Sequence, residues 1–133
     1  MLNWPKFFFV FGLLALLIAV LYIAGIYFSL FWLLPWFDIP MHILGGFWVS
    51  LAVLAIWFSF KKSIPENKIF FFILILATLI VGIFWEIFEY YFDIAFPGKE
   101  GYLYDTIKDL FDDLVGATLA FYYLKKKTLE MLL

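Results

Sequence analysis

The stretch IFFFILILATLIVGIFWEIFEYYF, residues 69–92, indicates how this chain folds. Its residues are almost all apolar or aromatic, and a helix of this length crosses about 30 Å of hydrocarbon at roughly 1.5 Å per residue. The main exceptions are Glu86 and Glu89. A carboxylate inside such a segment is costly and usually marks a functional site. The stretch therefore predicts a transmembrane helix that carries part of a site.

The composition of the whole chain agrees with a membrane protein. Of the 133 residues, 67% are hydrophobic and only 15% are charged. This balance is far from that of a soluble domain, so we expect an integral protein in contact with the lipid bilayer. The length suits a single transmembrane domain over residues 1–133. Because cysteine and arginine are both absent, thiolate metal sites are excluded and nucleic acid is not an expected partner.

Three further apolar segments accompany the first one. The pattern predicts an all-α, polytopic bundle of four transmembrane helices. Proline is expected in the breaks between helices, where its missing N–H does least harm. The predicted helices cover roughly residues 7–34, 41–60, 69–92 and 106–124, and the prolines assigned to the breaks are Pro35, Pro40, Pro65 and Pro97.

The lysines predict the orientation of the bundle. Seven of the nine lysines fall on one side of the four segments, and cytoplasmic loops carry the positive excess. Both termini are therefore expected in the cytoplasm, with the chain a multi-pass protein of the inner membrane. The other side has two lysines and nine acids, a formal balance of 2 − 9 = −7. Such a balance requires bound cations, protons or water in a medium of low dielectric constant.

Two stripes of acids descend from that outer side. At 100° per residue, Glu86, Glu89 and Asp93 share one helix face. A second stripe lies in YDTIKDLFDDLVGA, residues 104–117, with Asp113 and Lys108 on its two shoulders. The members of this second face are Asp105, Asp109, Asp112 and Gly116. The stripes are expected to face one another at matching depth.

The only histidine completes this pattern, in DIPMHILGGF, residues 38–47. Asp38 and His42 are one turn apart, and Gly45 and Gly46 allow another helix to approach closely. Imidazole with carboxylates suits a divalent ion such as Mg²⁺, Mn²⁺, Fe²⁺ or Zn²⁺. Asp38 is expected either to orient the imidazole or to act, like Asp112, as a general acid or base. The predicted metal ligands are His42, Glu86, Glu89, Asp109 and Asp105.

Plainer interpretations remain open for several of these residues. Asp93, Glu100 and Asp105 suit ordinary positions at the membrane interface. Asp38 also suits a helix cap ahead of Pro40, and a single histidine on an apolar helix is often a core residue. Lys108 is spaced to pair with Asp105 or Asp112, which would give Asp112 a structural role.

The three motifs together resemble a known family. Asp38-x3-His42 with Gly46-Phe47, then Glu86-x2-Glu89, then Asp105-Thr106-x2-Asp109-x6-Gly116-Ala117 resemble the YjdF-like bacterial inner-membrane proteins of unknown function. The resemblance covers roughly residues 30–120. More distantly, the chain resembles the VanZ-like group. It departs from the YjdF-like pattern in its shorter length and in the extra Asp112-Asp113 pair, and the resemblance supplies no reaction.

Different classes of function follow from these features. The first is a metal-dependent hydrolase or transferase that acts on a phospholipid or a lipid-linked phosphate, with its site in the outer half of the membrane. The second is a cation or proton transporter or binding protein. The apolar cytoplasmic halves of the four segments argue against a path through the bundle. A small accessory membrane subunit, whose acids bind a basic partner, is the third.

Overall fold

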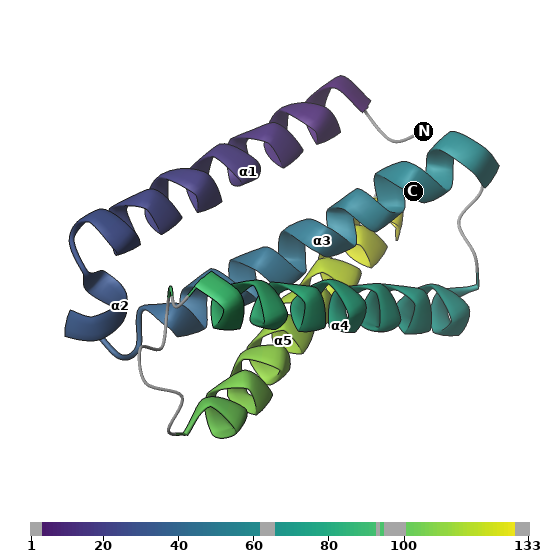
Figure 1. Cartoon of the computed structure of the whole chain (residues 1–133). Coiled ribbons are helices and arrows are strands. Elements are labelled where there is room, and N and C mark those ends of the chain that lie inside the picture. Colours follow the sequence, from purple (N-terminus) through teal and green to yellow (C-terminus); the bar gives the residue numbers. More distant parts are fainter. Residues whose placement is uncertain (1–3, 62–65, 93, 95–100, 130–133) are drawn as a thin grey trace.

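The structure, a computed structural model, describes residues 4–61, 66–92, 94 and 101–129. In these residues all regular secondary structure is helical, which confirms the all-α prediction. Figure 1 shows the arrangement, in which α1 lies along one side and α5 crosses the other helices. The helices are α1 (Trp4–Tyr27), α2 (Leu30–Leu33), α3 (Asp38–Lys61), α4 (Asn67–Phe92) and α5 (Tyr102–Leu129).

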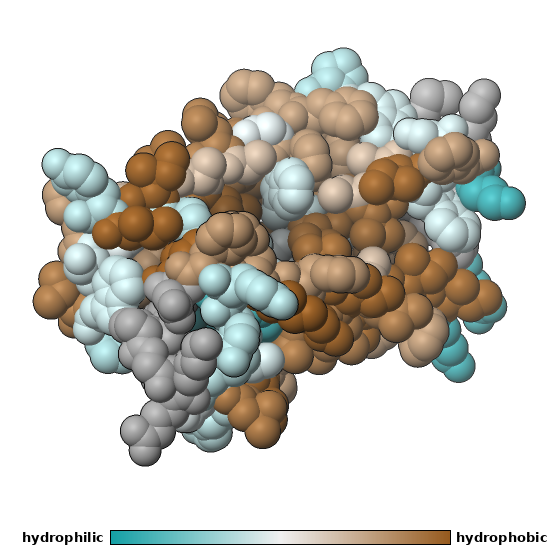
Figure 2. Space-filling view, in the orientation of Figure 1, coloured by the Kyte–Doolittle hydropathy of each residue, from teal (hydrophilic) through white to brown (hydrophobic). Residues whose placement is uncertain are grey.

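Three helices among the described residues, α1, α3 and α4, are long and apolar enough to cross a membrane. Large apolar side chains project outward from them, such as Phe9 at 70% exposure and Phe60 at 81%. Much of the face in Figure 2 is accordingly hydrophobic. Such a surface suits lipid and not water. Helix α5 has sufficient length, but the charged residues in its first half and the lysines near its end keep it outside this class.

The first predicted helix, residues 7–34, is wrong at its end, because α1 stops at Tyr27 and the chain turns back into α2. Ser29 has φ 55° and ψ 33°, the left-handed conformation, which breaks the helix. The turn places the Phe31 ring directly over Gly25, where a Cβ atom would collide with the ring. The chain therefore folds back after Tyr27, and Phe31 packs against Gly25 where a continuous helix would have carried it away from α1.

The other boundaries differ less from the predictions. Pro40 lies inside the first turn of α3, which begins at Asp38 and not at Met41. Its missing N–H does no harm there, because the first turn of a helix has no internal partner for that group. Helices α4 and α5 each extend beyond the predicted segments. Pro65, Pro97, Asp93 and Glu100 lie outside the described residues.

Glycines allow α3 and α5 to touch through their backbones. A Cβ atom on Gly46 would overlap the backbone of Asp113, and one on Gly116 would overlap the carbonyl of Ile43. Gly82 similarly lies against the Asp113 carboxylate. Small residues at crossings are the usual means of close packing in membranes. The three contacts bring the acidic half of α5 directly against α3 and α4.

The half of the bundle next to the α3–α4 connection is filled by apolar side chains. This cluster joins the second half of α3, the first half of α4 and the end of α5. Its buried members are Leu51, Leu54, Phe70, Leu74, Phe121 and Leu124. The polar residues described next lie at the opposite end of the molecule.

Candidate functional site

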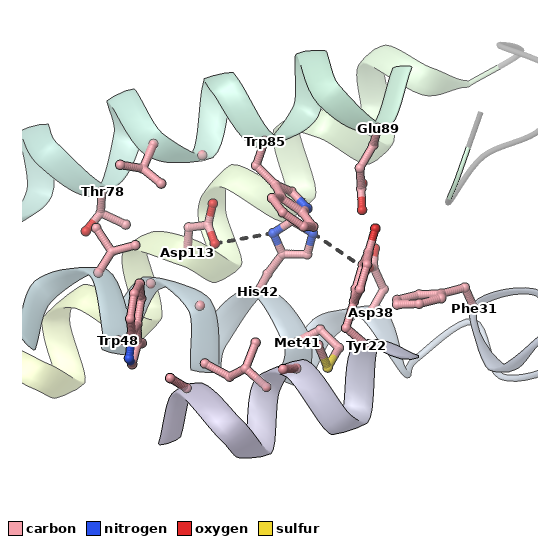
Figure 3. A pocket seen from close by; sticks show the side chains of 18 residues that line it. Tyr22, Phe31, Asp38, Met41, His42, Trp48, Thr78, Trp85, Glu89 and Asp113 are labelled. Carbon is pink, nitrogen blue, oxygen red and sulfur yellow. Dashed lines mark hydrogen bonds and ion pairs between the residues drawn. The ribbon is translucent and has the colours of Figure 1, made fainter. Parts of the chain in front are cut away.

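The site is centred on the imidazole of His42, which is 5% exposed. His42 is one turn inside α3, so it lies about 6 Å from the start of that helix. Its Nδ1 atom lies 3.3 Å from Oδ1 of Asp113 in α5. A carboxylate only accepts hydrogen bonds, so Nδ1 carries the proton and donates it to Asp113. The opposite ring atom, Nε2, is thereby directed toward Asp38, and Figure 3 shows this ion pair.

Three carboxylates from three helices face Nε2. The nearest oxygens lie at 3.5 Å for Asp38, 3.9 Å for Glu86 and 4.0 Å for Asp109. Neutral imidazole offers only a lone pair at Nε2, which repels carboxylate oxygens. Either a proton on Nε2 or a cation between these atoms is therefore needed to hold them together.

Each of these carboxylates has its second oxygen held by another residue. Oδ2 of Asp38 lies 3.7 Å from Nζ of Lys108, and Oδ1 of Asp109 forms an ion pair with the same amine. The hydroxyl of Thr106 donates to Oε2 of Glu86 over 2.8 Å. Each of the three carboxylates is thus held by a neighbouring side chain through one oxygen, while its other oxygen faces Nε2. Such outer partners are typical of metal sites, where they orient the ligands.

Glu86 supplies the clearest sign of a missing partner. The residue is 4% exposed, and its Oε1 atom, which faces His42, has no hydrogen-bond partner in the part of the chain that the structure describes. Tyr102 also donates its hydroxyl to the backbone carbonyl of Glu86 over 2.5 Å, so α5 holds this residue at two points. An unpartnered buried carboxylate oxygen is costly and points to a ligand at that position.

The separations suit a small divalent ion. Bonds of about 2.1 Å place neighbouring ligand atoms roughly 3 to 4.2 Å apart. The distances from Nε2 to the three carboxylates fall within this range. Among the described residues, two groups of three each offer one ligand atom per residue, with those atoms within 4.8 Å of one another: Asp38, His42 and Asp109, and His42, Glu86 and Glu89. The donor set is imidazole and carboxylate oxygen, which suits Mg²⁺, Mn²⁺, Fe²⁺ or Zn²⁺.

Two predicted site residues lie apart from this centre. Asp105 is at the rim, 27% exposed, with Oδ1 at 3.5 Å from Nζ of Lys108, and it belongs to neither group of three. Asp112 is buried at 9% exposure, and its Oδ2 has no hydrogen-bond partner among the described residues. The ion pairs of Lys108 with described residues join it to Asp38, Asp105 and Asp109, and not to Asp112.

The structure gives His42 a second aspartate partner beside Asp38, whose role in orienting the ring stays a prediction. Asp38 faces Nε2, whereas Asp113 accepts the hydrogen bond from Nδ1. The position of Asp113, one turn after Asp109 and three residues before Gly116, carries the signal that was missed. A residue about one helical turn from a glycine at a helix crossing is brought close to the facing helix. No comparable feature of the sequence indicated that Thr106 and Tyr102 hold Glu86.

A cavity of about 360 Å³ adjoins the site between α1, α3 and α4. Asp38, His42, Glu89 and Asp113 form part of its wall, and most of the remaining wall is apolar. Tyr22 of α1 and Trp85 of α4 meet near its polar end, with ring centroids 5.3 Å apart. The site is therefore connected to a space large enough for part of a lipid or another small molecule.

Neither curated proteins nor solved structures match this chain. A family model described as "Predicted membrane protein (DUF2238)" matches residues 3–127. The YjdF-like resemblance is confirmed, because YjdF-like is the known name of that family, while the VanZ-like relation stays a prediction. The match covers nearly the whole chain, and the protein therefore belongs to the DUF2238 family of predicted membrane proteins.

Proposed function

We propose that this protein is a metal-dependent membrane hydrolase or transferase that acts on a phospholipid or a lipid-linked phosphate. One observation carries the proposal. Nε2 of His42 and one oxygen each of Asp38, Glu86 and Asp109 converge, while their other polar atoms are held by Asp113, Lys108 and Thr106. The unpartnered Oε1 of Glu86 lies at this point of convergence. Glu89 supplies a further carboxylate beside it.

The excess of negative charge supports a cation and not a purely structural network. Six carboxylates surround or adjoin this point: Asp38, Glu86, Glu89, Asp105, Asp109 and Asp113. Among the described residues only Lys108 and His42 face them as possible cations. Buried carboxylates are destabilising unless they are paired, and two cations leave most of the six carboxylates without a positively charged partner. A divalent ion would offset two of those charges.

The chemistry follows from the ion and from one remaining carboxylate. A bound divalent ion lowers the pKa of a coordinated water and withdraws charge from a phosphate oxygen. Asp112, which follows Asp109 by three residues on α5 and is buried with one oxygen unpartnered among the described residues, is the group proposed to move a proton during the reaction. Asp38 and Asp109 hold the ion in this scheme. A phosphate can approach so acidic a site only with such a counter-cation.

We further propose that α5 is a fourth transmembrane helix and that both termini lie in the cytoplasm. The acids of α5 are covered by α3 and α4, which lowers the cost of placing this helix in the bilayer. The start of α1 and the end of α5 lie at the same end of the bundle as the end of α3 and the start of α4 (Figure 1). That end carries most of the lysines, which favours the cytoplasmic side of the inner membrane.

A transporter is the alternative, and the packing disfavours it. Leu51, Leu54 and Leu74 are at most 1% exposed and lie between the acidic end and the opposite end of the bundle. A cation that left the site toward the cytoplasm would have to cross this apolar cluster. The site is therefore better suited to binding and reaction than to passage.

Metal analysis of the purified protein tests the proposal. We expect about one equivalent of divalent ion per chain, with Glu86→Gln reducing the affinity at least tenfold. Glu66→Gln, a change of an exposed acid outside the site, is the matched control and should bind like the unchanged protein. Asp112→Asn should keep the ion yet lose release of phosphate from a panel of lipid phosphates.

The results separate the parts of the proposal. Absence of divalent-ion binding across Mg²⁺, Mn²⁺, Fe²⁺ and Zn²⁺ would refute the metal site. Tight binding with no lipid-phosphate turnover would refute the enzyme. Uptake of the ion into proteoliposomes that Glu86→Gln abolishes would favour the transporter.

A further inference from the structure

The cavity beside the site reaches the apolar outer surface of the bundle. Val81 of α4 lines it and is 46% exposed on a helix that spans the membrane. Ala15 and Ala19 of α1 line the opposite wall. Figure 2 shows this face of the molecule, with hydrophobic side chains around the region between α1 and α4. A ligand would therefore enter sideways from the hydrocarbon of the bilayer.

The shape of the cavity suits a hydrocarbon chain. Its lining runs from Asp38 to Val49 along α3 and from Thr78 to Glu89 along α4, about 16 Å on each helix. A volume of about 360 Å³ spread over that length is elongated and narrow. The walls along most of this length are apolar side chains or glycines. One extended chain fits such a space better than a compact polar molecule.

The polar end of the cavity combines carboxylates with aromatic rings. Figure 3 shows Glu89 projecting from α4 into this end, with Asp38 and Tyr22 on the side facing it. The rings of Tyr22, Phe31 and Trp85 lie around them, with centroids of Tyr22 at 5.8 Å from Phe31 and 5.3 Å from Trp85. The Tyr22 hydroxyl oxygen is buried there and has no hydrogen-bond partner among the described residues. Aromatic faces next to carboxylates are the arrangement that binds ammonium groups.

The carboxylates at the polar end of the cavity determine which charge the head group of a bound amphiphile should carry. The residues that line the cavity include Asp38, Glu89 and Asp113 but no lysine, and six carboxylates nearby are matched by only two possible cations in the described chain. A neutral head group would leave the acids unpaired, and an anionic one would be repelled. A positive head group is complementary in charge.

We propose that the cavity binds an amphiphile with one hydrocarbon chain and an ammonium head group, the chain between α1 and α4 and the ammonium between Asp38 and Glu89. Tyr22, Phe31 and Trp85 contact the ammonium. This site goes beyond the proposed metal chemistry and does not depend on it, because Glu89 and the aromatic rings attract the head group directly. A lipid whose head group carries both an ammonium and a phosphate would reach the two sites together.

Three probes with the same chain test the head-group preference. Binding of dodecyltrimethylammonium, dodecyl phosphate and a neutral dodecyl glycoside to the purified full-length chain is measured in excess chelator, so that divalent ions play no part. We expect one saturable site per chain and affinity for the ammonium probe at least about tenfold above the other two. Equal binding of the three probes would overturn the proposal.

Variants locate the probe within the cavity. Ala15→Trp fills the chain region and should abolish binding, whereas Leu16→Trp, on the exposed side of the same helix, should leave it unchanged. Glu89→Gln should reduce the affinity for the ammonium probe about tenfold, and Glu66→Gln should not. Tyr22→Leu should give a smaller loss by removing one ring, which keeps the test valid if the Glu89 variant does not fold.

The probe-binding experiments on the cavity can be distinguished from the tests of the metal site. Loss of divalent-ion binding with retained ammonium preference would refute the proposed function and leave this inference standing. Binding that Ala15→Trp does not alter, or a cavity closed by a second copy of the chain, would refute the inference alone.

Discussion

The hydroxyl of Thr106 holds one oxygen of Glu86 while the other oxygen faces His42. Thr106→Val keeps the shape of the side chain and removes this donor, so Glu86 loses its fixed direction. We expect divalent-ion affinity to fall about 10- to 100-fold, as is typical when an outer partner of a metal ligand is removed. Isothermal titration calorimetry of the purified protein with Mn²⁺ and Zn²⁺ measures this.

Thr118→Val is the matched control for that change. Thr118 lies on the same helix, and its hydroxyl donates only to the backbone carbonyl of Leu114 over 2.8 Å. It should therefore bind the ion like the unchanged protein. Equal affinities for Thr106→Val and Thr118→Val would show that the Thr106–Glu86 bond does not position a ligand.

The Glu86→Gln change should have opposite effects on two properties: it should raise the stability of the metal-free protein and weaken the binding of a divalent ion. Its buried, unpartnered oxygen is destabilising when no cation is bound, and glutamine removes the charge while its amide oxygen can still accept from Thr106. In excess chelator, Glu86→Gln should therefore raise the midpoint of thermal unfolding by a few degrees. Added divalent ion should stabilise the unchanged protein but not this variant. A lower midpoint for Glu86→Gln in chelator would instead indicate a structural carboxylate.

At the scale of helices, the crossing of α3 and α5 rests on two glycines. An added methyl group at Gly46 or Gly116 would overlap the backbone of the facing helix, which must move away. We expect each alanine variant to lose about 1 to 3 kcal/mol of stability, as for other overpacked positions. Both variants should also weaken metal binding, because Asp113 reaches His42 through this crossing. Thermal unfolding in detergent and metal titration measure the two effects.

Gly12 of α1 offers the comparison, since nothing lies within 4 Å of a Cβ atom placed there. Gly12→Ala should keep or slightly raise stability through its better helix propensity. If Gly46→Ala were as stable as Gly12→Ala, the close approach of α3 and α5 would be wrong.

The helices and the meeting of the acids could be foreseen from the sequence, but the contacts within the site could not. Long apolar segments indicate membrane helices because lipid leaves the backbone few alternatives. The end of α1 was missed because it depends on the Phe31–Gly25 contact, which exists only in the folded chain. Asp113 was missed as the partner of His42 for the same reason, since the depth of a helix crossing decides which of two adjacent aspartates faces the ring.

At the scale of the whole molecule, the apolar surface and the position of the charges place the protein in the bilayer. The large exposed apolar side chains of α1, α3 and α4 need lipid around them. Helix α5 differs: if it crosses the bilayer as proposed, its acids would be stable there only while α3 and α4 cover them. On that proposal, the insertion of α5 would be a property of the folded bundle and not of the isolated helix.

Cysteine labelling tests whether α5 crosses the membrane, because the natural chain contains no cysteine. Single changes at exposed positions near the two ends of α5, Tyr104→Cys and Lys125→Cys, should report opposite sides of the membrane if α5 crosses it. With a membrane-impermeant maleimide on intact cells from which any outer wall barrier has been removed, Tyr104→Cys should react and Lys125→Cys should not. After the membrane is opened with detergent, both should react. Reaction of both variants in intact cells, or of neither, would show that α5 does not span the membrane, while reaction of Lys125→Cys alone would place the termini and the lysines outside and reverse the proposed orientation.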